Sequence, residues 1–246
     1  MSASQTRIGR ICLAGSAVAA LGLLAMPANA DLPGFMMEWD ASHDTQNLFR
    51  YDPADYGDSY QEGPDQWRYI GQLRSEMWSI DWNVLVDPDP LVDAQIVVTN
   101  NADVFQTFSL LMILGVDPLA DGIARGSNSA TVTNEFNFDE GATLRTAGSG
   151  SIYRAFIDGG SPFKTLMDSP FALETDPIPF DTDSDTESFS NLASGPVNQT
   201  MAILLEFELS PGDSASINGF FEIVPGPGGL ALFAVFGLGL GGRRRR

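Results

Sequence analysis

The residues with the clearest spacing for chemistry are acidic and lie between positions 181 and 187. This segment reads Asp181-Thr-Asp-Ser-Asp-Thr-Glu187, so Asp181, Asp183 and Asp185 are each two residues apart. Carboxylates at alternate positions of a loop can wrap around one Ca²⁺ ion, which takes oxygen ligands. The segment is not an EF-hand loop, because it lacks glycine at the sixth position and has Leu192 at the twelfth. The sequence therefore leaves two interpretations open, a Ca²⁺ site or a solvated acidic loop.

Aromatic residues are the second candidate, because their rings combine a large apolar face with polar edges that suit sugar binding. Of the four tryptophans, Trp78 and Trp82 fall on the apolar face of an expected strand and are assigned to the core. Trp39 and Trp67 stand in polar surroundings, so we predict that these two contribute to a glycan-binding surface. The tyrosines that could extend this surface are Tyr51, Tyr56, Tyr60 and Tyr69.

Catalytic machinery is sparse in this sequence. The only histidine is His43, and no Gly-x-Ser-x-Gly motif accompanies it, so a Ser-His-Asp hydrolase is not indicated. One histidine and one cysteine are too few for a metal site of the His/Cys type. A glycosidase needs only two carboxylates about 5–10 Å apart, but the pattern singles out no pair among 32 acidic residues. We therefore expect a protein that is not an enzyme and has no cofactor, with Ca²⁺ as the one alternative.

The elements that must position these residues are expected to be β-strands. Apolar residues alternate with polar ones in segments 78–86, 108–114, 130–138 and 201–209, which is the period of a half-buried strand. Turn-forming Pro, Gly, Asn and Asp residues separate these segments, and no sustained helical stripe appears between them. The pattern predicts an all-β fold, an antiparallel β-sandwich of immunoglobulin-like or jelly-roll type.

The first 30 residues are typical of a secretory signal peptide. Two arginines precede an apolar stretch at residues 11–24, and Ala28 and Ala30 supply the small-x-small pattern of a cleavage site. The mature chain is therefore predicted to begin at Asp31. The only cysteine, Cys12, would leave with the signal peptide, so the mature protein would have no disulfide bond.

The last 23 residues combine a short motif, an apolar stretch and a basic end. The motif is Val224, Pro225, Gly226 and Pro227, and the apolar stretch covers residues 230–240. A membrane span takes about 20 apolar residues, so this stretch fits a transient hold in the membrane better than a permanent anchor. The basic end, which would stay in the cytoplasm, consists of Arg243, Arg244, Arg245 and Arg246.

These tail residues resemble the PEP-CTERM sorting signal of bacterial surface proteins. That signal has a Val-Pro-Glu-Pro-like motif, an apolar helix and a short basic end, and here Gly226 stands where the family usually has glutamate. Residues 87–101 and 106–110 are also similar to consecutive strands of a β-sandwich in many such proteins. The resemblance implies export, processing of the tail by an exosortase-type enzyme, and a place at the cell surface or in the extracellular matrix. It implies no activity.

Charge limits the partners of the body of the chain. All 32 acidic residues but only seven of the 13 basic ones lie between residues 31 and 223, which gives this part a net charge of −25. Such a charge repels nucleic acid and anionic lipid. We therefore expect no nucleic-acid partner. The expected partners are the secretion machinery, an exosortase-type enzyme, exopolysaccharide and, transiently through the C-terminal segment, the membrane.

Three segments follow: a signal peptide (1–30), a β-sandwich domain (31–223) and a sorting segment (224–246). The function we favour from the sequence is that of a non-enzymatic exported surface or extracellular-matrix protein whose tail is cleaved. The alternative is a carbohydrate-binding or glycan-acting β-sandwich. The two differ in whether Trp39, Trp67 and the nearby tyrosines converge on one exposed face.

Overall fold

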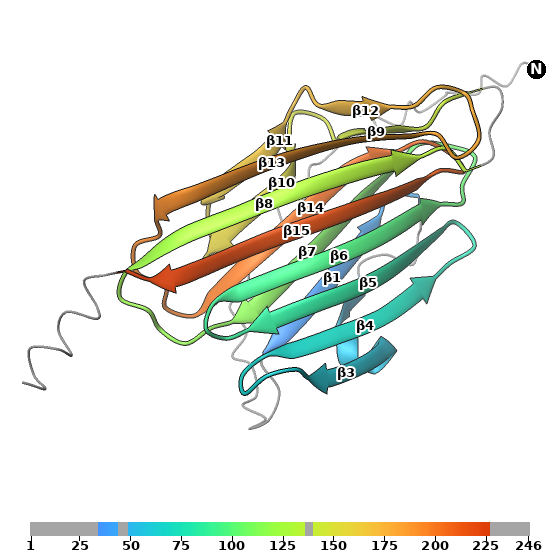
Figure 1. Ribbon diagram of the computed structural model, residues 1–246. Helices are drawn as coiled ribbons and strands as arrows, with labels where there is room; N and C mark the ends of the chain where they lie inside the picture. Colours follow the sequence, from blue (N-terminus) through green and yellow to red (C-terminus); the bar gives the residue numbers. More distant parts are fainter. Residues whose placement is uncertain (1–33, 44–48, 136–139, 227–246) are drawn as a thin grey trace, which may run out of the picture.

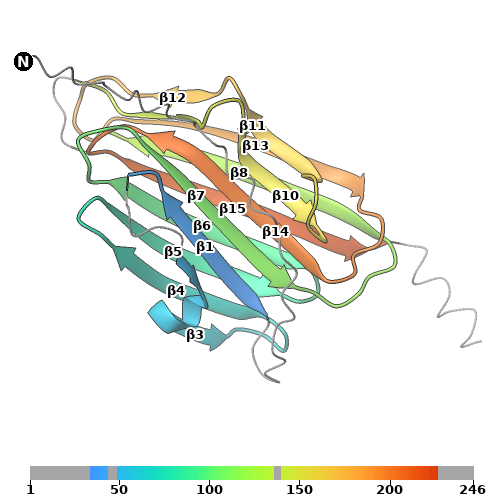
Figure 2. The same ribbon diagram turned by 180° about the vertical axis from the view of Figure 1, so that it is seen from behind.

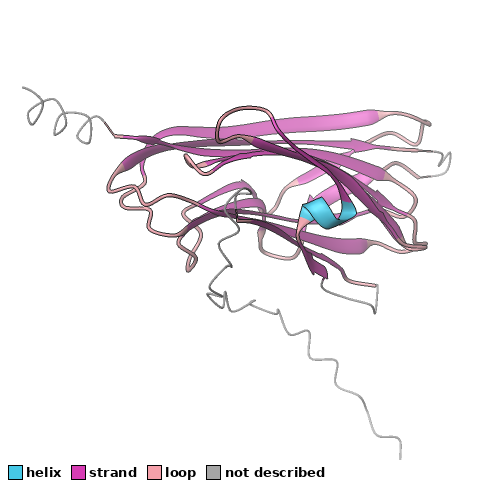
Figure 3. Ribbon diagram, turned by 90° about the horizontal axis from the view of Figure 1, so that it is seen from below, coloured by secondary structure: helices cyan, strands magenta, loops and turns pink. Residues whose placement is uncertain are grey.

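The computed structural model describes residues 34–43, 49–135 and 140–226, which form two antiparallel β-sheets packed face to face (Figure 1). Seen from below, the strands lie in two layers (Figure 3). The only helical element in the described ranges is a single 3₁₀ turn, η1 (Pro53–Tyr56). No helix in this part of the chain is long and apolar enough to cross a membrane. The prediction of an all-β fold with two antiparallel sheets is confirmed.

Sheet A has eight strands and faces the viewer in Figure 2. Its strands are β1 (Phe35–Ala41), β2 (Phe49–Tyr51), β7 (Gln106–Gly115), β9 (Thr143–Thr146), β10 (Ser151–Ile157), β11 (Lys164–Asp168), β12 (Ala172–Glu174) and β14 (Thr200–Leu209). Their order is β11-β10-β14-β7-β1-β2, and β9 pairs with both β14 and β12. Strands that are distant in sequence, such as β1 and β7, are therefore neighbours.

Sheet B has seven strands and faces the viewer in Figure 1. Its strands are β3 (Gly57–Gln61), β4 (Trp67–Arg74), β5 (Trp78–Asp87), β6 (Leu91–Asn100), β8 (Gly122–Thr133), β13 (Thr182–Ala193) and β15 (Ser214–Pro225). Their order is β13-β8-β15-β6-β5-β4-β3. The strands β13 and β3 form the two edges of this sheet.

The core lies between the sheets and follows from the alternation of side chains along each strand. In β5, the five residues expected to face inward are all buried, with 3% exposure or less: Trp78, Ile80, Trp82, Val84 and Val86. The same holds in β7 and β14, whose buried members are Phe108, Leu110, Met112, Leu114, Met201, Ile203, Leu205, Phe207 and Leu209. Ala130 and Val132 of β8 are buried too, whereas Phe136 and Phe138 lie outside the described residues. The period-2 pattern thus identified the core face of three central strands and part of a fourth.

A buried polar junction joins the two sheets where the chain passes from β14 to β15. These consecutive strands belong to different sheets and are linked by the turn at residues 210–213. The Asn100 Nδ2 group, at the end of β6, donates to the carbonyl oxygens of Leu209 at 3.0 Å and Ser210 at 3.1 Å. The Asn100 Oδ1 atom accepts a hydrogen bond from Nε2 of Gln106 at 2.8 Å. Asn100 therefore connects the end of a sheet B strand to two strands of sheet A.

Asp158 fastens the segment before β14 to the turn between β10 and β11. Its carboxylate accepts hydrogen bonds from the backbone N–H groups of Asn198 at 2.8 Å, Gln199 at 2.7 Å and Thr200 at 3.1 Å. Burial alone would raise the pKa of Asp158, but these hydrogen bonds outweigh it and hold the pKa below its ordinary value. The ionised carboxylate therefore stabilises the fold.

We expect Asp158→Asn to lower the free energy of unfolding at pH 7 by about 1–3 kcal/mol, the range for hydrogen bonds to a charged group. Asparagine tolerates the positive φ of 52° at this position, so the change tests the carboxylate. A carboxyl whose folded-state pKa is lowered loses its contribution as the pH falls through that pKa. In denaturant unfolding, the free energy of unfolding of the variant should therefore approach that of wild type below about pH 4. Asp65→Asn, at an exposed position, is the control, and a pH-independent difference for Asp158→Asn would contradict the assignment.

Candidate functional site

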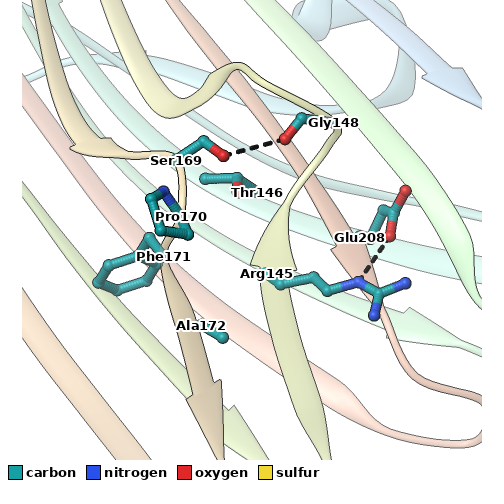
Figure 4. Close-up of a pocket in the computed structure, with 8 residues that line it drawn as sticks. All are labelled: Arg145, Thr146, Gly148, Ser169, Pro170, Phe171, Ala172 and Glu208. Carbon is teal, nitrogen blue, oxygen red and sulfur yellow. Dashed lines mark hydrogen bonds and ion pairs between the residues drawn. The ribbon is translucent and has the colours of Figure 1, made fainter.

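A pocket of about 490 Å³ lies on the outer face of sheet A, where β9, β12 and β14 pair. Arg145 of β9 is directly opposite Glu208 of β14 on one side and Ala172 of β12 on the other. Leu144 and Thr146 are buried, so Arg145 between them points outward. The residues that line this solvent-open pocket are Arg145, Thr146, Gly148, Ser169, Pro170, Phe171, Ala172 and Glu208 (Figure 4).

Arg145 is held in place by two neighbours. Its Nε atom donates to Oε2 of Glu208 at 2.7 Å, and its Cζ atom lies 4.6 Å from the ring centroid of Phe105. The carboxylate and the aromatic ring both stabilise the guanidinium. The side chains of Arg145 and Glu208 remain 48% and 26% exposed. The pair is therefore fixed in position and still accessible to a ligand.

The other side of the pocket is apolar. Figure 4 shows Pro170 and Phe171 on the β12 side, away from Glu208. The Ser169–Pro170 peptide bond is cis. The Oγ atom of Ser169 donates to the carbonyl oxygen of Gly148 at 3.1 Å, and Gly148 has a φ of 63°, which glycine adopts without strain. A fixed rim thus places an apolar wall opposite a charged pair.

A second ion pair lies two residues away on β14, at Glu206. Glu206 points to the same face as Glu208 and pairs with Arg154, and burial lowers the pKa of Arg154. The backbones of the two glutamates lie about 6–7 Å apart along the strand. Each carboxylate is held by an arginine, which donates to its Oε2 atom. The arrangement offers a polar ligand both hydrogen-bond donors and acceptors.

The prediction that Trp39 contributes to a surface is wrong. Trp39 lies in β1 with 1% exposure, and its ring stacks on Phe108 with centroids 5.4 Å apart. Trp78 packs against it at 5.4 Å. The polar neighbours Glu38 and Asp40 are the outward half of an alternating strand, so they indicate nothing about the exposure of Trp39 itself.

The other predicted aromatic residues do not gather into one exposed face with Trp39. Trp67 is half-buried in β4 and packs against the core, and Tyr69 is buried with 1% exposure. Tyr56 and Tyr60 are exposed. The side chain of Tyr51 lies outside the described residues, and His43 is exposed.

The prediction that the acidic segment 181–187 is a loop is wrong, because Thr182 begins the edge strand β13. Carboxylates at alternate positions fit the spacing of a Ca²⁺ loop, but the same period belongs to a strand. Asp181 and Asp183 accept hydrogen bonds from the backbone N–H groups of Asp176 and Glu174, and Asp185 accepts one from Thr186. Among the described residues, no group of three or more His, Cys, Asp or Glu residues could hold a metal ion.

The acidic residues of β13 have a different effect on the fold. This strand pairs only with β8, so it forms one edge of sheet B. Charged side chains on an edge strand oppose pairing with a strand from another chain. The acidic character of β13 therefore favours a sheet that ends at this strand.

The residues predicted to act in targeting lie mostly outside the described ranges. These are Ala28, Ala30, Pro227, Arg243, Arg244, Arg245 and Arg246. The first three residues of the tail motif are described. Val224 and Pro225 are the last residues of β15, where they pair with Ile123 and Gly122 of β8, and the Gly226 N–H group donates to the carbonyl oxygen of Asp121 at 3.1 Å.

Sequence reasoning missed the pocket residues Arg145 and Phe171. One signal was available: only seven basic residues accompany the 32 acidic ones in the body, so an arginine between Leu144 and Thr146 in a short apolar segment is conspicuous. No pattern linked this arginine to Glu208, which is 63 positions away in the sequence.

No protein-family model matches the chain, and no curated protein matches it. Among solved structures, the chain is similar to TmCBM61, determined in complex with β-1,4-galactotriose. The match has 14% sequence identity and a TM-score of 0.28, and covers 59% of this chain and 88% of that chain. At this TM-score the similarity does not establish a shared fold or ligand.

Proposed function

We propose that the protein is an exported, non-enzymatic protein of the cell surface or extracellular matrix, whose tail is processed by an exosortase-type enzyme. The observation that carries this proposal is the junction between body and tail. Val224 and Pro225 end β15, at one end of the sandwich (Figure 1). The tail motif therefore begins within the last two residues of the final strand, without a spacer between body and tail.

The tail experiment compares two variants with wild type in the producing cell. Deleting Arg243, Arg244, Arg245 and Arg246 should release unprocessed protein to the medium or mis-sort it, since these residues would hold the tail on the cytoplasmic side. Replacing Pro225 and Pro227 should leave full-length protein in the membrane fraction. Immunoblots of membrane, surface and medium fractions measure both effects. Wild-type surface protein that keeps Arg246 and stays in the membrane would show that the tail is a simple anchor.

A second function is favoured by the pocket: binding of glycan, through which the exported body would be retained in an exopolysaccharide layer. The residues first predicted for this role included Trp39, which lies in the core. The pocket offers a different set, with the Arg145–Glu208 pair facing the wall of Pro170 and Phe171. An open pocket with one polar and one apolar side matches a sugar ring, which has hydroxyls around its edge and C–H groups on its face.

Arg145→Ala should weaken polysaccharide binding at least about tenfold, because a charge-assisted hydrogen bond contributes about 1.5–3 kcal/mol. Affinity electrophoresis against a panel of soluble polysaccharides measures the loss. The matched control is Arg74→Ala, which removes an arginine of another exposed ion pair, with Asp81, on sheet B. Equal retardation of both variants and wild type in every polysaccharide gel would exclude this pocket as the binding site.

A further inference from the structure

We propose that the pocket selects uncharged saccharides that present two adjacent hydroxyl groups, and that it rejects saccharides carrying carboxylate, sulfate or phosphate groups. This inference rests on the glycan-binding function proposed above and specifies the ligand of the same site.

The charged pair supplies a matched donor and acceptor. The Nε atom of Arg145 is occupied by Oε2 of Glu208 at 2.7 Å. Within the described residues, the terminal nitrogens of Arg145 and the Oε1 atom of Glu208 form no hydrogen bond with another residue. A guanidinium can only donate and a carboxylate can only accept. One hydroxyl of a sugar can therefore accept from Arg145 while the adjacent hydroxyl donates to Glu208.

The opposite wall fits the apolar face of the same ring. Pro170 and Phe171 lie on the β12 side of the pocket, away from Glu208 (Figure 4). Phe171 is partly buried against the core, and covering the surface that remains exposed with C–H groups adds a contribution that increases with the area covered. The volume of about 490 Å³ falls within the range of about 300–1,000 Å³ that is usual for ligand pockets. Because the pocket is open to solvent, a saccharide chain can continue past the bound ring.

The charge distribution disfavours an acidic ligand. Arg145 is neutralised by Glu208, and the neighbouring Arg154 is neutralised by Glu206. The three other arginines with described side chains are also ion-paired: Arg68, Arg74 and Arg125. An anion at the terminal nitrogens of Arg145 would find the guanidinium charge offset by Glu208, in a body with a net charge of −25. Repulsion between the anion and the Glu208 carboxylate beside it makes binding of an acidic ligand unfavourable.

The decisive variant is Glu208→Gln, which keeps the shape of the side chain but frees the charge of Arg145. Calorimetric titration would use neutral gluco-, manno- and galacto-oligosaccharides and, as the acidic probe, oligogalacturonate. Wild type should bind at least one neutral oligosaccharide and bind oligogalacturonate at least tenfold more weakly. Glu208→Gln should bind the same neutral ligand about tenfold more weakly and should gain affinity for oligogalacturonate.

Asp81→Asn is the matched control, because it frees Arg74 from an exposed pair of the same kind outside the pocket. It changes the net charge by the same amount and should alter neither affinity. Thermal melting confirms that both variants are folded. If wild type binds oligogalacturonate as tightly as any neutral ligand, or if Glu208→Gln behaves like Asp81→Asn, the selectivity inference is overturned while glycan binding stands. If wild type binds neither class, the glycan-binding function fails, and the inference with it.

Discussion

Replacing Asn100 with alanine is expected to lower the free energy of unfolding by about 3–5 kcal/mol. Asn100 is fully buried, and its side-chain amide serves Leu209, Ser210 and Gln106. Its Oδ1 atom also accepts from the N–H group of Ala102 at 3.0 Å. Each buried polar group left without a partner costs about 1–3 kcal/mol, and alanine would leave several such groups without a partner at once. Urea unfolding followed by tryptophan fluorescence measures the loss.

Gln95→Ala provides the control for this prediction. Gln95 lies on the same strand, β6, but is exposed, and surface substitutions of this kind usually change stability by about 0.5 kcal/mol or less. If Asn100→Ala lowered the free energy of unfolding by less than about 1 kcal/mol, the polar junction would not hold the two sheets together. Even one buried polar group without a partner costs about that much.

The second large effect is expected from Trp39→Ala, at about 3–5 kcal/mol, the usual range for deleting a large buried aromatic side chain. The ring fills space between Trp78 and Phe108 in the core. Trp39→Phe should cost less, because it keeps part of the volume and the aromatic contacts. The same urea titration measures both variants.

The stability of Trp39→Ala decides whether Trp39 lies in the core or on the surface, where its polar neighbours would place it. Trp67→Ala is the comparison, since Trp67 is only half-buried and should cost less. If Trp39→Ala kept the stability of wild type and lost polysaccharide binding, Trp39 would be a surface residue and its place in the core would be wrong.

The sheet strands could be predicted from the sequence because alternation is a local property. In β5 and β14 each inward residue is apolar and the register needs no knowledge of the partner strand. The segment Phe35–Ala41 alternates as clearly, with Phe35, Met37, Trp39 and Ala41 all buried. Glu38 and Asp40 form the opposite face of this strand, so they do not mark Trp39 as exposed.

The edge strand β13 could not be predicted from local propensity. Aspartate is depleted in strands, and the segment 181–187 contains acids at every second position. Pairing with β8 from Thr182 to Ala193 overrides that preference. The pairing depends on which strands the topology brings together, and no pattern within the segment reports it.

The pocket escaped prediction for the same reason. Arg145, Phe171 and Glu208 are separated in the sequence and meet because β9 pairs with both β14 and β12. Each residue alone looks like an ordinary strand or loop residue. The order of the strands in the sheet brings these residues together, and the alternation of apolar and polar residues does not predict that order.

The most direct test of the account is the intact mass of the protein extracted from the surface of the producing cells. Export and tail processing predict a chain that begins at Asp31 and lacks Arg243, Arg244, Arg245 and Arg246. A surface protein whose mass includes both the first 30 residues and Arg246 would contradict the account.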